Sequence, residues 1–412
     1  MPVRTNPDAA WFQCTSTGAI LTTMAGMSTE FRDSGRNAWL PFEILGEVFH
    51  HVVYEDGPPA LRHVMFVCKL WYTASIHHPQ LWTRIFLDGP FFKYFKDTPI
   101  LSTCAFLQQW LDRSGTSPLH LRLGCNYLYE FYPSRRSGLD LSVETADRRF
   151  VLLLDVMKKS DKVHIKRIES LVCRSAAEYL VEEDILSIFP PQLPLLRFMS
   201  ISSLCYESAV SFSHCPLLTE VELSDYYERR PFFQSRDLAR VKTLSFHNNG
   251  NWMSDDIVYI KGFASLEVLV LSNGTTGIHG YRGSRYSSTR NHADTPVKLP
   301  HLRILTVRGT VPKDIFLRLI APALQELLIE DDDKGRTSVP DLYTLIPPSC
   351  HRIRTHLSPK VKGANSLWSK DLTSLVEMAP QINVLYVSKW MQQEMEGLFH
   401  NQSFELRVEM EQ

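Results

Sequence analysis

The sequence predicts an α/β chain, α+β overall, in which a small helical module precedes a long solenoid of short strands. Two observations predict this fold class. Residues 38–87 carry apolar side chains at helical spacing, whereas from about residue 90 onward short apolar runs alternate with polar connections. In that second part, one aliphatic pattern recurs at intervals of 22 to 36 residues, apart from one interval of 58 residues, and such recurrence is typical of a repeat protein.

The composition is that of a folded chain with almost no net charge. Hydrophobic residues make up 44% of the 412 residues, and 44 basic against 45 acidic side chains give a formal charge of -1. Such a chain has no global field that would attract nucleic acid or an anionic membrane. No window approaches the roughly 18 consecutive apolar residues of a membrane span. We therefore expect no nucleic-acid partner and no membrane partner.

Cysteine usage and the N-terminus indicate the compartment. The eight cysteines are scattered without a C-x-x-C pair, which argues against a zinc site or a disulfide framework and suits a reducing compartment. The first residues lack the apolar stretch of a secretory signal. We expect a cytoplasmic and/or nuclear protein, with residues 1–36 as a flexible tail.

The helical module is predicted over residues 37–88 and opens with a helix that starts at Leu40-Pro41. Proline suits a first helical turn, because its missing N–H would have no partner there in any case. The apolar positions that follow lie on one helical face. They are Ile44, Leu45, Val48, Phe49, Val52 and Val53. Gly57-Pro58-Pro59 is expected to end this helix.

Two further helices are expected in the module. The second spans about residues 60–75, and the third is short and opens at Pro79. The apolar face of the second comprises Leu61, Val64, Cys68 and Trp71. Three short amphipathic helices bury little apolar surface by themselves. The module must therefore pack against the rest of the chain or against a partner, which is the physical reason to suspect a docking function.

Three sequence blocks in this module resemble the F-box family. They are Leu40-Pro41-Phe42-Glu43-Ile44-Leu45, Val67-Cys68-Lys69-Leu70-Trp71 and Pro79-Gln80-Leu81-Trp82. The blocks occur in the order and at the spacing of that family. The wider layout is similar to that of F-box proteins abundant in mushroom-forming fungi.

The resemblance implies docking without catalysis. In the F-box family the module binds a Skp-type adaptor, which bridges to a cullin scaffold and a RING subunit, while the F-box protein holds the substrate. The adaptor-binding residues are then predicted to be Leu40, Pro41, Ile44, Leu45, Val67, Cys68, Leu70, Trp71, Leu81 and Trp82. Among these, Leu81 and Trp82 should also close the helical bundle. Trp71 and Val48 are expected mainly in the core of the module.

The repeat pattern is L-x-x-L-x-L with aliphatic substitutes. Its units begin at Ile168, Leu196, Leu218, Val241, Leu266, Leu302, Leu324 and Ile382. Most spacings fit the period of about 20–29 residues of leucine-rich repeats. Each unit is expected to contribute a strand whose alternate side chains enter a shared core. A further unit is expected near residues 351–357, and a first strand at Leu119-Leu121-Leu123.

Residues 89–412 are therefore predicted to form a degenerate leucine-rich-repeat-like region that binds the substrate. The consensus asparagine is missing from most units, so the solenoid should be irregular. A generic α/β protein with short buried strands is the alternative interpretation.

The interval of 36 residues is longer than its neighbours and predicts an inserted loop. The surplus matches residues 273–296, which are rich in Gly, Ser, Thr and Arg. Insertions in repeat proteins often emerge on a binding face, so Arg282, Arg285 and Arg290 are candidates for substrate contact. An ordinary surface loop is the alternative.

The sequence contains no recognisable Walker loop, H-E-x-x-H or G-x-S-x-G motif. We therefore expect a non-catalytic protein without a cofactor or a metal site. A basic stretch is interpreted as a solvated helix face, with a receptor for an acidic segment as the alternative. It comprises Lys158, Lys159, Lys162, Lys166 and Arg167.

Two functional hypotheses follow from these patterns. The resemblance implies a substrate-recognition subunit of a Skp–cullin–F-box type E3 ubiquitin ligase, which binds an unknown protein substrate through its repeats. The alternative is a non-catalytic leucine-rich-repeat interaction scaffold without ligase association, whose helical start only caps the solenoid.

Overall fold

The computed structural model divides the chain into two compact units, Met1–Val48 and Phe49–Gln412, and the division falls inside the first described helix. The described residues are 41–56, 58–88, 91, 95, 98–124, 152–153, 155–157, 163–174, 189, 192–202, 214–224, 238–248, 260–273, 296–309, 316, 318–330, 346–356, 377, 381–388, 392, 396 and 405–409. Within these ranges, no helix has the length and apolar content that crossing a membrane requires.

Helix α3 (Phe42–Asp56) begins in the first unit, of which residues 41–48 are described. The amide of Leu45 donates to the carbonyl of Pro41 over 3.0 Å, so the proline directly precedes the first helical turn, as predicted. Glu43 places negative charge at the positive end of the helix. The predicted start of the helix is therefore confirmed.

The second unit continues with helices α4 (Pro58–Met65) and α5 (Lys69–His77). The prediction of one helix over residues 60–75 is wrong, because the chain leaves the helix between these two elements. Cys68 has φ -162° and ψ 170°, an extended conformation that an α-helix cannot accommodate. Helix α3 ends at Asp56 as expected, and the following prolines open α4, where a first turn tolerates them.

The predicted third helix is only a 3-10 turn, η2 (Pro79–Trp82). Strand β1 (Arg84–Leu87) follows it at once and pairs in parallel with β2 (Leu119–Gly124). The segment 37–88 therefore contributes its last residues to the large sheet. Helix α7 (Ile100–Arg113) connects these two strands along the chain.

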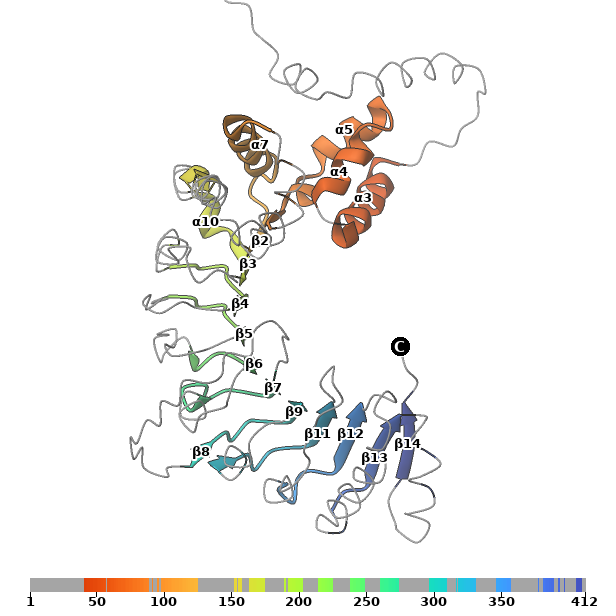
Figure 1. Ribbon diagram of the computed structural model, residues 1–412, viewed down its shortest axis with the longest axis vertical. Coiled ribbons are helices and arrows are strands. Elements are labelled where there is room, and N and C mark those ends of the chain that lie inside the picture. Colours follow the sequence, from red (N-terminus) through yellow and green to blue (C-terminus); the bar gives the residue numbers. More distant parts are fainter. Residues whose placement is uncertain are drawn as a thin grey trace, which may run out of the picture. The chain divides into compact units, whose positions relative to one another are not determined.

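Twelve strands of the described part form one sheet in which every neighbouring pair is parallel, and they succeed one another in chain order (Figure 1). After β1 and β2 they are β3 (Ile168–Arg174), β4 (Phe198–Ser202), β5 (Glu220–Ser224), β6 (Thr243–Asn248), β7 (Val268–Asn273), β9 (Ile304–Arg308), β11 (Glu326–Glu330), β12 (Arg352–His356), β13 (Val384–Ser388) and β14 (Glu405–Glu409). The short β8 (Val297–Lys298) and β10 (Leu319–Ile320) pair separately. This order is that of a repeat array, so the predicted fold class is confirmed.

One row of aliphatic side chains crosses the sheet and forms its core. In register from β3 to β13 it comprises Leu171, Met199, Val221, Leu244, Leu269, Leu305, Leu327, Ile353 and Leu385. Each of these side chains is at most 1% exposed. The predicted strands are all present, including the first strand and the unit near residue 351. Strands β1 and β14 were not predicted.

Arg167 lies in the turn between the short helix α10 (Val163–Lys166) and β3, and it is buried. Its guanidinium donates to the carbonyl of Ser117 over 2.7 Å and to the hydroxyl of Ser114 over 3.1 Å. A buried guanidinium is tolerated when its N–H groups find such acceptors. The interpretation of Arg167 as part of a solvated face is therefore wrong, while Lys158, Lys159 and Lys162 lie outside the described residues.

Candidate functional site

The first unit exposes an apolar pair on α3. Ile44 and Val48 are 47% and 44% exposed, and their spacing of four residues places them on one side of the helix. Val48 is therefore not the core residue that was predicted. Leu45 is only 1% exposed, so its predicted contact with an adaptor needs correction, because a buried side chain offers no surface to a partner. Pro41 is exposed, and Leu40 lies outside the described residues.

The second unit exposes apolar side chains where α4 ends. Val67 is 56% exposed and Cys68 is also exposed, so both are accessible to a partner. Phe66, which the sequence reasoning missed, is 40% exposed. The guanidinium of Arg62 lies 5.4 Å from the ring centroid of Phe66. The signal for Phe66 was an aromatic residue directly before the Val-Cys block, but the assumed continuous helix concealed the break that exposes it.

Trp71 lies between the core and the surface. Its ring packs 5.0 Å from that of Phe49, and both Trp71 and Leu70 are half-buried. The hydroxyl of Ser75, one turn later on α5, donates to the carbonyl of Trp71 over 2.8 Å. Trp71 thus stabilises the helical module and leaves part of its surface accessible.

Leu81 and Trp82 are core residues of the second unit, 1% and 2% exposed. The indole N–H of Trp82 donates to the carbonyl of Ser75 over 2.8 Å, and its ring lies 4.7 Å from that of Trp110 on α7. Their predicted contact with an adaptor therefore needs correction. Trp82 connects the 3-10 turn η2 to helix α7, as expected of a residue that closes the helical bundle.

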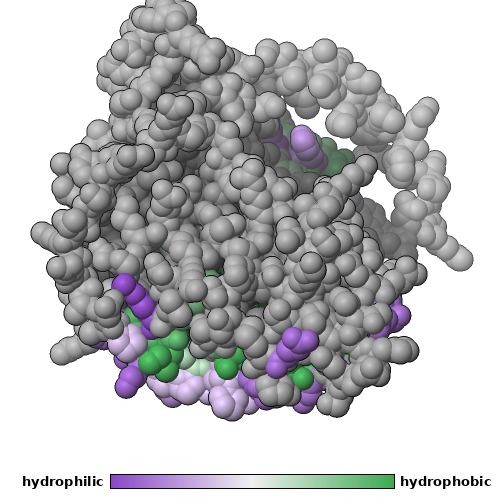
Figure 2. Space-filling view, turned by 60° about the horizontal axis from the view of Figure 1, so that its bottom comes forward, coloured by the Kyte–Doolittle hydropathy of each residue, from purple (hydrophilic) through white to green (hydrophobic). Residues whose placement is uncertain are grey.

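Opposite the buried row, the repeat sheet carries a second row of alternating side chains, which we call the outward row. In register from β2 to β14 it comprises Arg122, Val172, Ser200, Glu222, Ser245, Val270, Thr306, Leu328, Arg354, Tyr386 and Arg407. Arg122 stands at its N-terminal end, and Arg354, Tyr386 and Arg407 follow one another at its C-terminal end. Figure 2 shows hydrophobic and hydrophilic residues intermixed among the residues that it colours.

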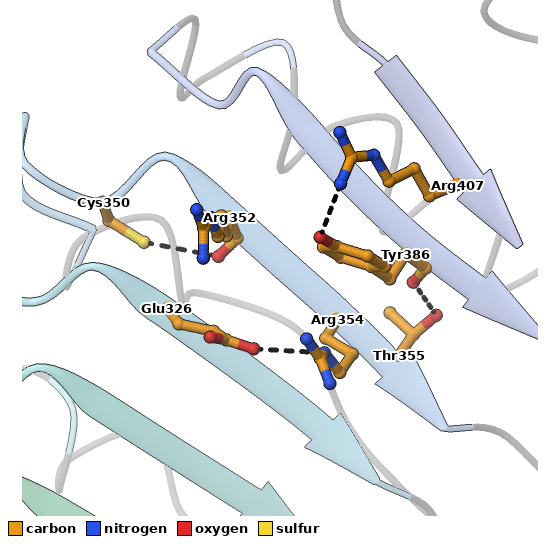
Figure 3. Close-up of polar contacts among 7 residues, drawn as sticks. All are labelled: Glu326, Cys350, Arg352, Arg354, Thr355, Tyr386 and Arg407. Carbon is orange, nitrogen blue, oxygen red and sulfur yellow. Dashed lines mark hydrogen bonds and ion pairs between the residues drawn. The ribbon is translucent and has the colours of Figure 1, made fainter. Parts of the chain in front are cut away.

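At the C-terminal strands, two arginines flank one tyrosine (Figure 3). The guanidinium of Arg354 lies 4.7 Å from the ring centroid of Tyr386 and 3.1 Å from a carboxylate oxygen of Glu326. Arg407 donates to the Tyr386 hydroxyl over 3.3 Å, and two of its nitrogens lie 2.8 Å from the carboxylate oxygens of Glu405. Each arginine is therefore held by a carboxylate and by the same aromatic ring.

Two buried groups support this cluster from behind. The hydroxyl of Thr355, which is 0% exposed, donates to the carbonyl of Tyr386 over 3.0 Å and links β12 to β13. The thiol of Cys350 points to the carbonyl of Arg352 at 3.7 Å (Figure 3). Burial raises the pKa of this thiol to about 11, so it stays protonated and has a structural role.

In the middle of the sheet, His247 connects three strands. Its Nδ1 forms a hydrogen bond with the hydroxyl of Ser272, and its Nε2 lies 3.5 Å from a carboxylate oxygen of Glu222. Burial lowers the pKa of His247, the charge of Glu222 opposes that effect, and Arg308 adds to it. Ser272 is only 5% exposed, so this network joins β5, β6 and β7 and offers no accessible nucleophile.

The N-terminal strands carry a second pair of stacked arginines. Arg84 lies 3.9 Å from the ring centroid of Tyr54, and Arg122 lies 4.2 Å from that of Phe86. Arg122 also approaches Asp88 to 3.5 Å, and this partner opposes the desolvation that raises the pKa of the Asp88 carboxyl. Both ends of the outward row therefore present ordered guanidinium groups.

Within the described ranges, no group of three or more histidine, cysteine, aspartate or glutamate side chains could hold a metal ion. The predicted loop residues Arg282, Arg285 and Arg290 lie outside the described part, so their contact with a substrate stays a prediction.

Comparison with protein families identifies the N-terminal segment. Residues 39–88 match the family model described as F-box-like. This segment is F-box-like. The F-box-like segment contains all three sequence blocks that suggested the resemblance, and it ends directly after β1. It accounts for the helices of the module and for the first strand of the large sheet.

Comparison with solved structures finds the leucine-rich repeat-containing protein LegL7 from Legionella pneumophila. The likeness covers 78% of this chain and 83% of that chain, at 14% sequence identity and a TM-score of 0.33. Comparison with curated proteins gives no match.

Proposed function

We propose that this chain is the substrate-recognition subunit of a Skp–cullin–F-box type E3 ubiquitin ligase, acting in the cytoplasm and/or nucleus. The observation that carries the proposal is the F-box-like match over residues 39–88. In this proposal the F-box-like segment binds a Skp-type adaptor, which connects to a cullin scaffold. The repeat region binds the protein that is to be ubiquitinated, and the chain itself performs no chemistry.

The exposed apolar side chains of the F-box-like segment support adaptor binding. The first unit presents Ile44 and Val48, and the second unit presents Phe66 and Val67. Covering large apolar groups that are exposed to water in the free chain lowers the free energy and so favours binding. Such groups supply most of the binding energy of an interface. Leu45, Leu81 and Trp82 act differently, because they support the segment from inside.

Co-purification of the full chain with a fungal Skp-type adaptor tests the proposal. We expect the wild-type chain to bind, and we expect Val67→Asp to weaken binding at least about tenfold, since it would bury an unpaired carboxylate in an apolar contact. Ile44→Asp probes the first unit in the same way. Binding affinity is measured by calorimetry with purified adaptor.

Leu101→Asp is the matched control, because Leu101 on α7 is an 80% exposed leucine outside the F-box-like segment. Circular dichroism verifies that each variant folds. Equal weakening by Leu101→Asp would show that the loss is not specific to the segment. If the folded wild-type chain binds no Skp-type adaptor, the proposal fails in favour of an interaction scaffold without ligase association.

A further inference from the structure

We propose that the outward side of β12, β13 and β14 binds an acidic segment of a partner protein, with Arg352 as the residue that receives its carboxylate or phosphate. We call this surface the arginine–tyrosine strip, defined by Arg352, Arg354, Tyr386 and Arg407 (Figure 3). That the partner is a substrate for ubiquitination rests on the proposed function. Binding of the acidic segment does not depend on it.

Three of the four residues of the strip, Arg354, Tyr386 and Arg407, are held in place before any partner arrives. Glu326 holds Arg354 at 3.1 Å, and Glu405 holds Arg407 through two contacts of 2.8 Å. Both guanidiniums also contact Tyr386, whose ring centroid lies 4.7 Å from Arg354 and 5.8 Å from Arg407. Because Arg354, Tyr386 and Arg407 are already restrained, these side chains lose little conformational entropy when a partner binds beside them. Binding therefore costs less entropy than it would on mobile side chains.

Arg352 is the arginine of the strip that takes no part in these ion pairs. It precedes Arg354 by two residues on the same strand, so both side chains leave the sheet on the same side. Arg352 is exposed, and none of the described residues forms an ion pair with it. Its neighbours in register are Glu326, which is engaged by Arg354, and the apolar Val384.

Charge complementarity favours an isolated acidic side chain in the partner. Among the described residues, the three arginines of the strip form ion pairs with two carboxylates, those of Glu326 and Glu405, so the described side chains of this surface carry an excess of one positive charge. A guanidinium binds carboxylate and phosphate groups through paired hydrogen bonds. The two flanking glutamates would repel a continuous polyanion such as nucleic acid. An acidic residue between neutral residues fits this pattern better.

The dimensions of the strip suit a short extended segment. Adjacent strands lie about 4.8 Å apart, so the distance from β12 to β14 is about 10 Å. An extended chain covers that distance with about three residues. A partner crossing the three strands would therefore place one acidic residue at Arg352 and its next residue over Val384, the neighbour of Arg352 in register on β13, two residues before Tyr386.

Selection from degenerate peptide pools tests this inference. The full chain is immobilised and exposed to pools whose central residue is fixed as Glu, phosphoserine, Gln or Lys. We expect the Glu pool, the phosphoserine pool or both to be retained about threefold to tenfold more than the Gln pool, with the preference decreasing as salt increases. The Lys pool should be retained least. A higher retention of phosphoserine than of Glu would assign the site to a phosphorylated partner.

Arg352→Gln should abolish the preference for acidic pools, because it removes the excess positive charge while the rest of the strip stays in place. Arg303→Gln is the matched control, since Arg303 is an exposed arginine that directly precedes β9. Absence of an acidic preference in the wild type, its persistence in Arg352→Gln, or an equal loss in Arg303→Gln would overturn the inference. Single-stranded oligonucleotides that compete for the strip would also overturn it.

Adaptor binding measured on the same proteins separates the two proposals. A wild-type chain that selects acidic peptides without binding a Skp-type adaptor would contradict the ligase function alone. Normal adaptor binding without peptide selection would contradict only the assignment of the strip.

Discussion

His247 lies on β6 between Glu222 of β5 and Ser272 of β7, and it shows how burial outweighs a nearby charge. A carboxylate at 3.5 Å favours the imidazolium ion, yet the net effect of the surroundings lowers the pKa of His247. The cause is desolvation, to which the charge of Arg308 adds. The folded chain therefore prefers the neutral imidazole, which forms the hydrogen bond with Ser272.

This preference makes the stability of the fold depend on pH. The unfolded chain protonates His247 near its usual pKa of 6.5, whereas the folded chain resists protonation. The contribution of His247 is therefore fully present above pH 6.5 and is lost as the pH falls from 6.5 through the lower pKa of the folded state. One group contributes at most about 1.4 kcal/mol per pH unit. Urea unfolding between pH 7.5 and pH 5.5 measures the loss.

We expect His247→Gln to reduce this pH dependence and His301→Gln, at an exposed position, to leave it unchanged. A smaller dependence remains in the His247 variant, since the pKa values of His120 and His164 are also lowered by burial. An identical pH dependence in wild type and His247→Gln would contradict the assignment to His247.

In strand β7, alternate side chains pack in the core and face the outward side of the sheet. Leu269 and Leu271 are both 0% exposed and belong to the core, while Val270 between them belongs to the outward row and is half-buried. Successive side chains of a strand point to opposite faces, so a single residue decides whether a change affects packing or the surface. The same rule places Arg352 and Arg354 on the surface around the buried Ile353.

We expect Leu269→Ala to lower the free energy of unfolding by about 2–5 kcal/mol, because it leaves a cavity in a fully buried row. Val270→Ala on the same strand should cost less than about 1.5 kcal/mol, since this side chain is only partly removed from water. Urea unfolding at one pH measures both values. Equal losses for the two variants would show that β7 is buried on both faces.

The helices of the F-box-like segment show how a break within an element creates a surface. The chain leaves the helix at residues 66–68, and this break exposes Phe66 and Val67. A continuous helix would repeat every 3.6 residues and would turn these positions away from each other. The adaptor contact proposed for the second unit therefore depends on an interruption that helical periodicity does not reveal.

The sheet as a whole is a linear array, because each strand pairs only with its neighbours in register. The described strand β14 pairs with β13 alone, whereas β6 pairs with both β5 and β7. In such arrays stability is close to a sum of the repeats and their nearest-neighbour contacts. The last strand is therefore expected to open more easily than an interior strand.

Amide hydrogen exchange tests this expectation. We expect the amides of β14 to exchange at least about tenfold faster than those of β6, which corresponds to a difference of about 1.4 kcal/mol in opening free energy. Mass spectrometry of peptides from the two strands measures the rates, with intrinsic rates as the reference. Equal protection would mean that the array opens as a single cooperative unit.

Much of this architecture could be predicted from local patterns. The spacing of Leu196, Met199 and Ile201, repeated along the chain, predicted the strands, because alternate apolar residues identify a buried face. Strand β14 escaped prediction, since its sequence Glu-Leu-Arg-Val-Glu lacks the full repeat pattern. Of the candidate site, the family-like blocks contain Ile44 and Val67, which are exposed, whereas Phe66 was missed and Val48 was wrongly assigned to the core. Periodicity identifies an apolar face without saying how much of it is covered.

The sequence by itself determined the two-part organisation of the chain and the identity of its F-box-like segment, because apolar spacing and short motif blocks are local properties. The tertiary structure decided which of those apolar residues stay accessible: it buries Leu45, Leu81 and Trp82 and leaves Ile44 and Val67 in water. It also decided that Arg354, Tyr386 and Arg407, distant in sequence, form one strip across three strands. Exposure and register depend on contacts between distant segments, which no local pattern contains.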